Sequence, residues 1–149
     1  MVASKWRSRA MTLWFCLVVL VHGCGGHGPL IPRIERALTA AERNQIDTLA
    51  DMIDEAGPMW AEHSHTVRVL LAAGRIGVGR LPKGKDSWAT WHPRQSNIIL
   101  APSFWQLQNT GQAGLLVIEA CHVRCACEDA CDGQMFLWVR DYQLLTGDR

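Results

Sequence analysis

Residues 113–132, A-G-L-L-V-I-E-A-C-H-V-R-C-A-C-E-D-A-C-D, organise the rest of this chain. The first part is almost wholly apolar, and its leucines and alanines favour a helix. A helix that is apolar on nearly every side is a buried core helix. Glu119 and His122 break this pattern from neighbouring positions one turn apart. A carboxylate and an imidazole in a core helix are costly unless something binds them, so this pair is the main clue to function.

Residues 118–122 read I-E-A-C-H, which resembles the H-E-x-x-H motif of the zincin metallopeptidases. In that motif, histidines at i and i+4 share one zinc ion from the same helix face. The glutamate accepts a proton from the zinc-bound water. The resemblance implies that His122 is a zinc ligand and that Glu119 is the catalytic base. Ile118 stands where the first histidine belongs, so one ligand position is degenerate.

Residues 128–132, E-D-A-C-D, look like the E-x-x-S/A-D element of the thermolysin-like zincins. The resemblance implies that Glu128 is a metal ligand and that Asp132 hydrogen-bonds to a zinc-bound histidine. The segment between His122 and Glu128 is shorter than in the thermolysin-like enzymes. Catalytic zinc needs three protein ligands and an open water position. His122 and Glu128 supply only two, so we expect weak zinc binding.

Residues 1–23 are typical of an export signal rather than of a folded segment. Three basic residues lead into an apolar run from Met11 to Val21, which is too short for a standard membrane-spanning helix. The run ends in L-V-H-G-C, which looks like a bacterial lipobox with Cys24 as the lipidated residue. We therefore predict an exported bacterial lipoprotein, anchored to the membrane through Cys24 on the periplasmic or cell-surface face. An ordinary signal peptide cut nearby is the alternative.

Glycines and prolines are dense in residues 24–33, which predicts a flexible tether before one domain over residues 34–149. The whole chain has 15 Lys and Arg against 14 Asp and Glu. Without the signal, 12 basic residues face 14 acidic ones, a formal charge of −2. This balance gives no reason to expect nucleic acid or an anionic membrane surface as a partner.

The predicted export determines which state we expect for the cysteines. Of six, Cys16 lies in the signal and Cys24 would carry lipid. The remaining four are Cys121, Cys125, Cys127 and Cys131. An even number in an exported domain favours disulfides, so we predict two bridges among these four, with the pairing open.

The pattern of apolar residues predicts an α+β fold of zincin-like type. Thr39 and Glu42 fit a capping box that opens a helix running to about Ala56, and Gly57-Pro58 leads into a second helix. Alternation then predicts a small antiparallel sheet within residues 75–100, followed by the core helix and by a packed second helix over residues 128–145. The resemblance implies that Asn97 to Leu100 forms the edge of a cleft and pairs with extended peptide substrate.

Three functions from different classes remain. The first is a zincin-like lipoprotein with a degenerate zinc motif, weakly active or inactive, that is, a pseudoenzyme. The second is an active zinc hydrolase that uses His122, Glu128 and either a cysteine thiolate or His92. The third is a structural or binding lipoprotein in which the cysteines are only braces. We expect His63 and His65 to be surface or capping residues.

Overall fold

The computed structural model describes residues 32–81, 88–125 and 128–147, with the side chains of residues 128 and 129 left out. The predicted signal, most of the tether, Cys24 and Cys127 therefore lie outside the described residues. The described part is α+β, as predicted. Its elements, in chain order, are β1 (Arg33–Ala37), α2 (Ala40–Glu55), the 3-10 turn η1 (Pro58–Trp60), α3 (Ala61–Ala72), β2 (Ile76–Arg80), β3 (Ala89–His92), β4 (Asn97–Leu100), the 3-10 turn η2 (Pro102–Gln106), α4 (Asn109–Arg124), α5 (Glu128–Asp132) and α6 (Gln134–Thr146).

The sheet has the order β1-β2-β4-β3 and is mixed. The β1/β2 and β3/β4 pairs are antiparallel, whereas β2 and β4 are parallel. The prediction of an antiparallel sheet is therefore wrong, because alternation identifies strands but not their neighbours. Strand β1 was not predicted at all.

The position of β4 also corrects the expected cleft. Strand β4 has a partner on each side, so its backbone groups have no free edge on which to pair with a peptide. Strand β3 is an edge strand instead. Strand β1 lies at the opposite edge of the sheet.

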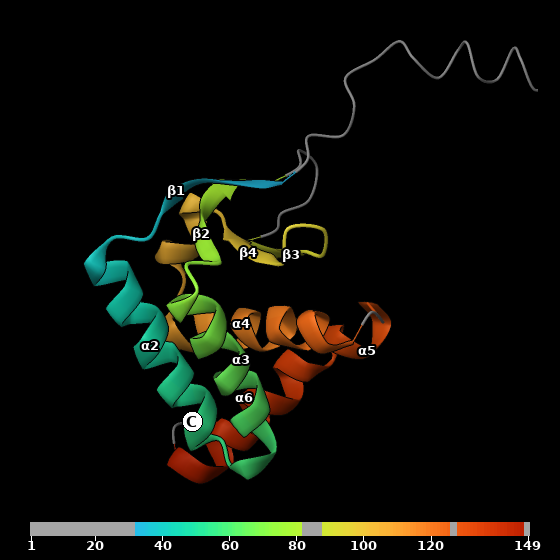
Figure 1. Cartoon of the computed structure of the whole chain (residues 1–149). Coiled ribbons are helices and arrows are strands. Elements are labelled where there is room, and N and C mark those ends of the chain that lie inside the picture. The colour runs from blue at the N-terminus through green and yellow to red at the C-terminus, as the bar shows by residue number, and fades with distance from the viewer. Residues whose placement is uncertain (1–31, 82–87, 126–127, 148–149) are drawn as a thin grey trace, which may run out of the picture. The chain divides into compact units, whose positions relative to one another are not determined.

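The helices of the described chain gather on one face of the sheet, and α4 runs directly beneath it (Figure 1). The predicted capping box opens α2, with Thr39 and Glu42 bonding each other's backbone N–H groups. Gly57 and Gly74 have positive φ at the ends of α2 and α3, a conformation that glycine adopts without steric cost. The capping box and Gly57 explain why both ends of α2 agree with the prediction.

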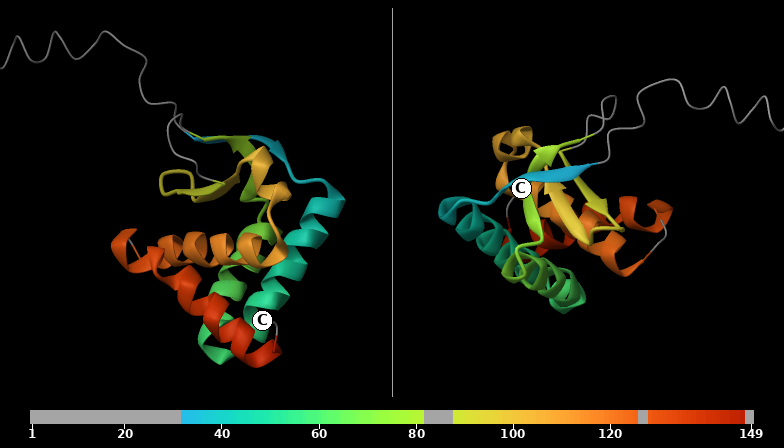
Figure 2. Two further views of the ribbon diagram at one scale, coloured as in Figure 1. Left: turned by 180° about the vertical axis from the view of Figure 1, so that it is seen from behind. Right: turned by 45° about the horizontal axis from the view of Figure 1, so that its top comes forward.

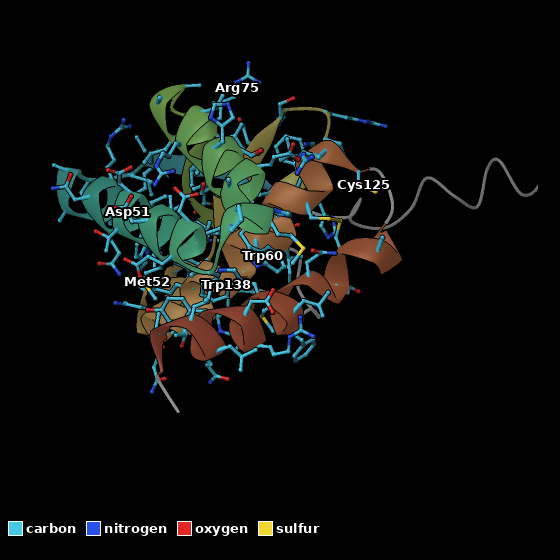
Figure 3. The ribbon with its side chains drawn as sticks, turned by 90° about the horizontal axis from the view of Figure 1, so that it is seen from below. Asp51, Met52, Trp60, Arg75, Cys125 and Trp138 are labelled. Carbon is cyan, nitrogen blue, oxygen red and sulfur yellow. A yellow bond between two sulfur atoms is a disulfide. The ribbon has the colours of Figure 1, made fainter. Side chains whose placement is uncertain are left out.

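Helix α4 is the centre of the core. It packs on α2, α3 and α6 and also contacts β3. Seen from below, Trp60 and Trp138 lie between the helices, and both are fully buried (Figure 3). Trp60 donates its indole N–H to Asp141 of α6 at 3.2 Å. This hydrogen bond joins η1, which leads into α3, to α6.

The segment expected as one helix over residues 128–145 forms two. Gly133 separates α5 from α6, and α6 packs closely on α4, where a Cβ at Gly114 would lie 2.6 Å from the Met135 side chain. Among the described residues, we find no helix long and apolar enough to cross a membrane.

Candidate functional site

Glu119 lies beneath the free edge of β3. Its carboxylate accepts a hydrogen bond from the backbone N–H of Trp91. The carbonyl of Trp88 bonds to the amide of Ala101, so alternate residues of β3 turn their backbone groups towards β4. The groups of Trp91 therefore face outward, where the core helix meets them. Glu119 thus caps one polar group of the edge strand.

Burial dominates the electrostatics of Glu119, which is 7% exposed. Loss of hydration raises the pKa of this carboxyl to about 7, the Trp91 N–H opposes the rise, and the charge of Asp132 adds to it. A buried carboxyl without a nearby cation favours its neutral form. Near neutral pH, the Glu119 carboxyl is therefore partly protonated, and Asp132 lies near enough for its charge to favour the protonated form.

His122 follows Glu119 by one helical turn and is half-buried. Its Nε2 atom is buried, and no described residue gives it a hydrogen-bond partner. His92, the remote histidine considered as a ligand, likewise has a buried Nδ1 atom without a partner. Ile118 is half-buried and presents only hydrocarbon at the degenerate position.

The second half-motif is only partly described. Glu128 begins α5, but its side chain lies outside the described residues, so its predicted convergence with His122 stays a prediction. Asp132 ends α5 and is exposed. The charge of Asp132 acts on Glu119, the residue expected to be the base, and raises its pKa.

A disulfide joins Cys121 of α4 to Cys131 of α5, with the two Cα atoms 5.5 Å apart. This bond agrees with one of the two bridges expected. Cys125, at the end of α4, is bonded to no described cysteine (Figure 3). Cys127 is outside the described residues, so the second bridge stays a prediction. While Cys121 and Cys131 are bonded to each other, neither supplies the thiolate of the altered zinc site.

The described donors do not form a zinc site. The orphaned Nε2 of His122 suits a metal, since buried polar atoms usually have partners. However, nowhere in residues 32–81, 88–125 and 130–147 do three His, Cys, Asp or Glu side chains gather closely enough to hold a metal ion. A catalytic zinc needs three protein ligands. Within those residues, therefore, no group of side chains meets this requirement.

His63 corrects a further expectation. It is buried rather than on the surface, and no described residue bonds its Nδ1 atom, whereas His65 is exposed. Burial lowers the pKa of His63, and the charge of Arg124 at the end of α4 lowers it further, against Glu62. Arg124 and Glu62 form an ion pair between α4 and α3. The spacing of the histidines predicted that they would face different ways, but not which one would be inside.

Sequence reasoning missed a pocket at the other end of α4. It has a volume of about 420 Å³ and is lined by residues of α2, of η2 and of the start of α4. Figure 2 shows η2 leading from the sheet into α4, with α2 beside the start of α4. Its walls include Glu42, Gln45, Trp105, Leu107, Asn109 and Gln112. We call it the α2–α4 pocket. No motif marks it, because its residues come from three segments that only the fold brings together.

Comparisons with known proteins identify no relative: no family model, no curated protein and no solved structure matches this chain.

Proposed function

We propose that this chain is an exported, lipid-anchored protein of zincin-like type whose motif helix no longer supports zinc peptidase chemistry, or does so only weakly. The observation that carries the proposal is the state of the motif itself. Glu119 lies beneath an edge strand and His122 follows it by one turn of α4, in the order of a base and a ligand, but Ile118 contributes no donor. The protein is in this view a pseudoenzyme.

Two further contacts support the loss of activity. The Glu119 carboxyl is buried and bonded to Trp91, whereas a general base must reach a water molecule. The thiols of Cys121 and Cys131 are bonded to each other, which leaves the altered-ligand hydrolase only Cys125, Cys127 or His92 as a third donor. A peptide or protein is the partner that the resemblance implies, although the edge of β3 is closed to it at Trp91, whose N–H the Glu119 carboxylate accepts.

A disulfide-braced structural or binding lipoprotein is the second candidate. The Cys121–Cys131 bond favours it, because the bond ties α4 to the segment that follows and needs no metal to do so. Zinc content separates the two candidates from the active hydrolase: we expect the purified mature protein to hold little zinc and to cleave peptides slowly or not at all.

The decisive variant is Ile118→His, which would restore the missing imidazole. Without metal, it should lower the free energy of unfolding by roughly 1–3 kcal/mol, because packing is lost and a polar ring is partly buried. Zinc should then restore stability, since a ligand that binds the folded state stabilises it by mass action. Thermal unfolding with and without zinc measures both effects.

Ile118→Asn is the matched control. It introduces a polar side chain at the same place but no imidazole, so it should be destabilised to a similar extent and gain nothing from zinc. If zinc fails to stabilise Ile118→His, His122 and its neighbours do not converge on one point, and the zincin-like interpretation of this site is wrong. Stoichiometric zinc and zinc-dependent peptidase activity in the natural protein would instead refute the loss of function.

A further inference from the structure

His63 lies buried at the junction where α3 begins beside the end of α4. It is 8% exposed, and no described residue bonds its buried Nδ1 atom. The His63 ring lies 5.3 Å, centroid to centroid, from the ring of Trp60 at the end of η1. Beside it, Glu62 of α3 forms an ion pair with Arg124, the last residue of α4. A neutral imidazole fits this junction, because it needs no counter-charge when it is buried.

A charged His63 would be unfavourable at this position. His63 is the third residue of α3, where the first N–H groups and the helix dipole present positive charge. Arg124 adds a full positive charge, and the Glu62 carboxylate that opposes it is already paired with Arg124. Burial and the charge of Arg124 therefore lower the pKa of His63.

The carboxylates that α6 and α2 bring to this end of α3 are also occupied. Asp141 of α6 accepts the indole N–H of Trp60 at 3.2 Å, and Asp54 of α2 accepts the hydroxyl of Ser64. Each of these two carboxylates is paired with an arginine as well. An imidazolium at His63 would thus have to compete for acceptors that other groups already use.

The junction is separate from the zincin-like motif. His122 and Arg124 are two residues apart on α4, so their side chains leave the helix about 200° apart. Arg124 reaches α3 through its ion pair with Glu62, so His122 leaves α4 on the far side from α3. Glu119 lies beneath β3 instead. A response of this junction to pH therefore reports His63 rather than the motif.

The segment that leads into His63 is weakly fixed apart from one side chain. Among the described residues, no side chain caps η1 or α3, and Gly57, with φ 113°, separates η1 from α2. The side chains of Glu62 and Arg124 are 70% and 44% exposed, and exposed ion pairs contribute little stability. Trp60, which is fully buried, is therefore the main contact that keeps this segment in place.

We propose that residues 58–63 form an acid-sensitive segment, which detaches from α4 and α6 when His63 takes up a proton. The imidazolium moves into water, and Trp60, whose ring lies against it, leaves its place between the helices (Figure 3). The pKa of His63 is lower in the closed form than its ordinary value of 6.5, so the closed form is favoured at high pH. The open form gains as the pH falls below 6.5, and acidification thereby exposes a buried apolar surface.

Hydrogen exchange of the purified protein, followed by mass spectrometry at pH 7.5, 6.0 and 5.0, tests the proposal. The amides of residues 65–67 bond to carbonyls in the first turn of α3 and report its opening. After correction for intrinsic exchange, their protection should fall at least about 3-fold from pH 7.5 to 5.0. The ceiling is about 30-fold, the limit for one imidazole that titrates at 6.5 in the open form. The protection of α2 should not fall with it.

His63→Phe keeps a ring beside Trp60 but cannot take up a proton, so its protection at residues 65–67 should not depend on pH. His63→Gln is a second neutral variant if His63→Phe does not fold. His65→Gln is the matched control: His65 is exposed on the same helix, and its loss should leave the pH dependence of the parent unchanged.

A titration of the His63 ring protons by NMR completes the test, and its midpoint should lie below pH 6.5. The proposal fails if the protection of residues 65–67 is equal at pH 7.5 and 5.0, or if α2 loses protection in parallel. It also fails if a neutral variant at position 63 keeps the pH dependence, if His65→Gln abolishes it, or if His63 titrates at or above pH 6.5.

Discussion

Burial makes the protonation of Glu119 part of the folding equilibrium. Its pKa is about 7 in the folded chain against an ordinary value of 4.5, so the folded state holds this proton more tightly than the unfolded state does. Between these two pH values, the unfolded state releases the proton first. The contribution of Glu119 to stability is therefore highest below pH 4.5 and declines as the pH rises to about 7.

We predict that Glu119→Gln abolishes this decline. The amide keeps the size of the side chain and an oxygen that accepts the Trp91 N–H, but it does not titrate. Relative to the variant, the parent should lose about 3 kcal/mol of unfolding free energy between pH 4.5 and pH 8. Urea unfolding at pH 4.5, 6, 7 and 8 measures the difference.

The comparison between variants matters more than the slope of either one. Burial lowers the pKa of His63, so this residue favours the folded state as the pH rises and partly masks Glu119. Glu55→Gln, at an exposed position at the end of α2, is the control and should change the profile little. Parallel profiles for the parent and Glu119→Gln would show that the carboxyl is not buried as described.

At the scale of elements, the Cys121–Cys131 bond closes the loop between α4 and α5. A short loop of this kind constrains the unfolded chain, and the chain-entropy model gives about 2–3 kcal/mol for it. We predict that Cys121→Ala/Cys131→Ala lowers the unfolding free energy of oxidised protein by this amount. Chemical denaturation of parent and variant, with and without reductant, measures it, and reduced parent should approach the variant.

Cys125→Ala is the matched control, since it leaves the Cys121–Cys131 bond intact. It should destabilise the protein less than the double variant does, because a bridge from Cys125 to Cys127 would close a shorter loop. Peptide mapping of exported, non-reduced protein should also recover residues 121 and 131 in one linked fragment. A different linked pair, or a Cys125→Ala variant as unstable as the double variant, would contradict the pairing.

In the molecule as a whole, β1 completes the sheet by pairing closely with β2. A Cβ at Gly79 would collide with the backbone carbonyl of Arg33 and would approach the Ile99 side chain to 2.8 Å. The backbone cannot yield as a flexible side chain would. We therefore predict that Gly79→Ala lowers the unfolding free energy by roughly 2–3 kcal/mol, because β1 must shift or separate.

Gly133→Ala is the opposite case. Gly133 has φ −74°, and a Cβ there would meet nothing within 4 Å. Alanine should be neutral or stabilise the protein by about 0.5–1 kcal/mol, because it restricts the unfolded chain. Thermal unfolding of the two variants side by side tests the contrast. Equal effects of the two substitutions would mean that β1 does not lie on β2 as described.

Features that depend on interactions between residues close in the chain can be predicted from the sequence, whereas features that depend on distant segments cannot. The capping box at Thr39 and the helix end at Gly57 are local signals, and the structure agrees with both. The motif helix also follows from its own composition. By contrast, the break at Gly133 and strand β1 depend on packing between segments, and sequence reasoning missed both.

By itself, then, the sequence determined that the described chain is α+β and that Glu119 and His122 lie one turn apart on a core helix, because helix periodicity and capping act over a few residues. Contacts between distant segments determine that β3 rather than β4 is an edge, that Trp91 bonds Glu119, that His63 is buried, and that α2, η2 and α4 line an open pocket. These features join residues distant in the chain. Their energies come from desolvation and packing, which no short stretch of sequence specifies.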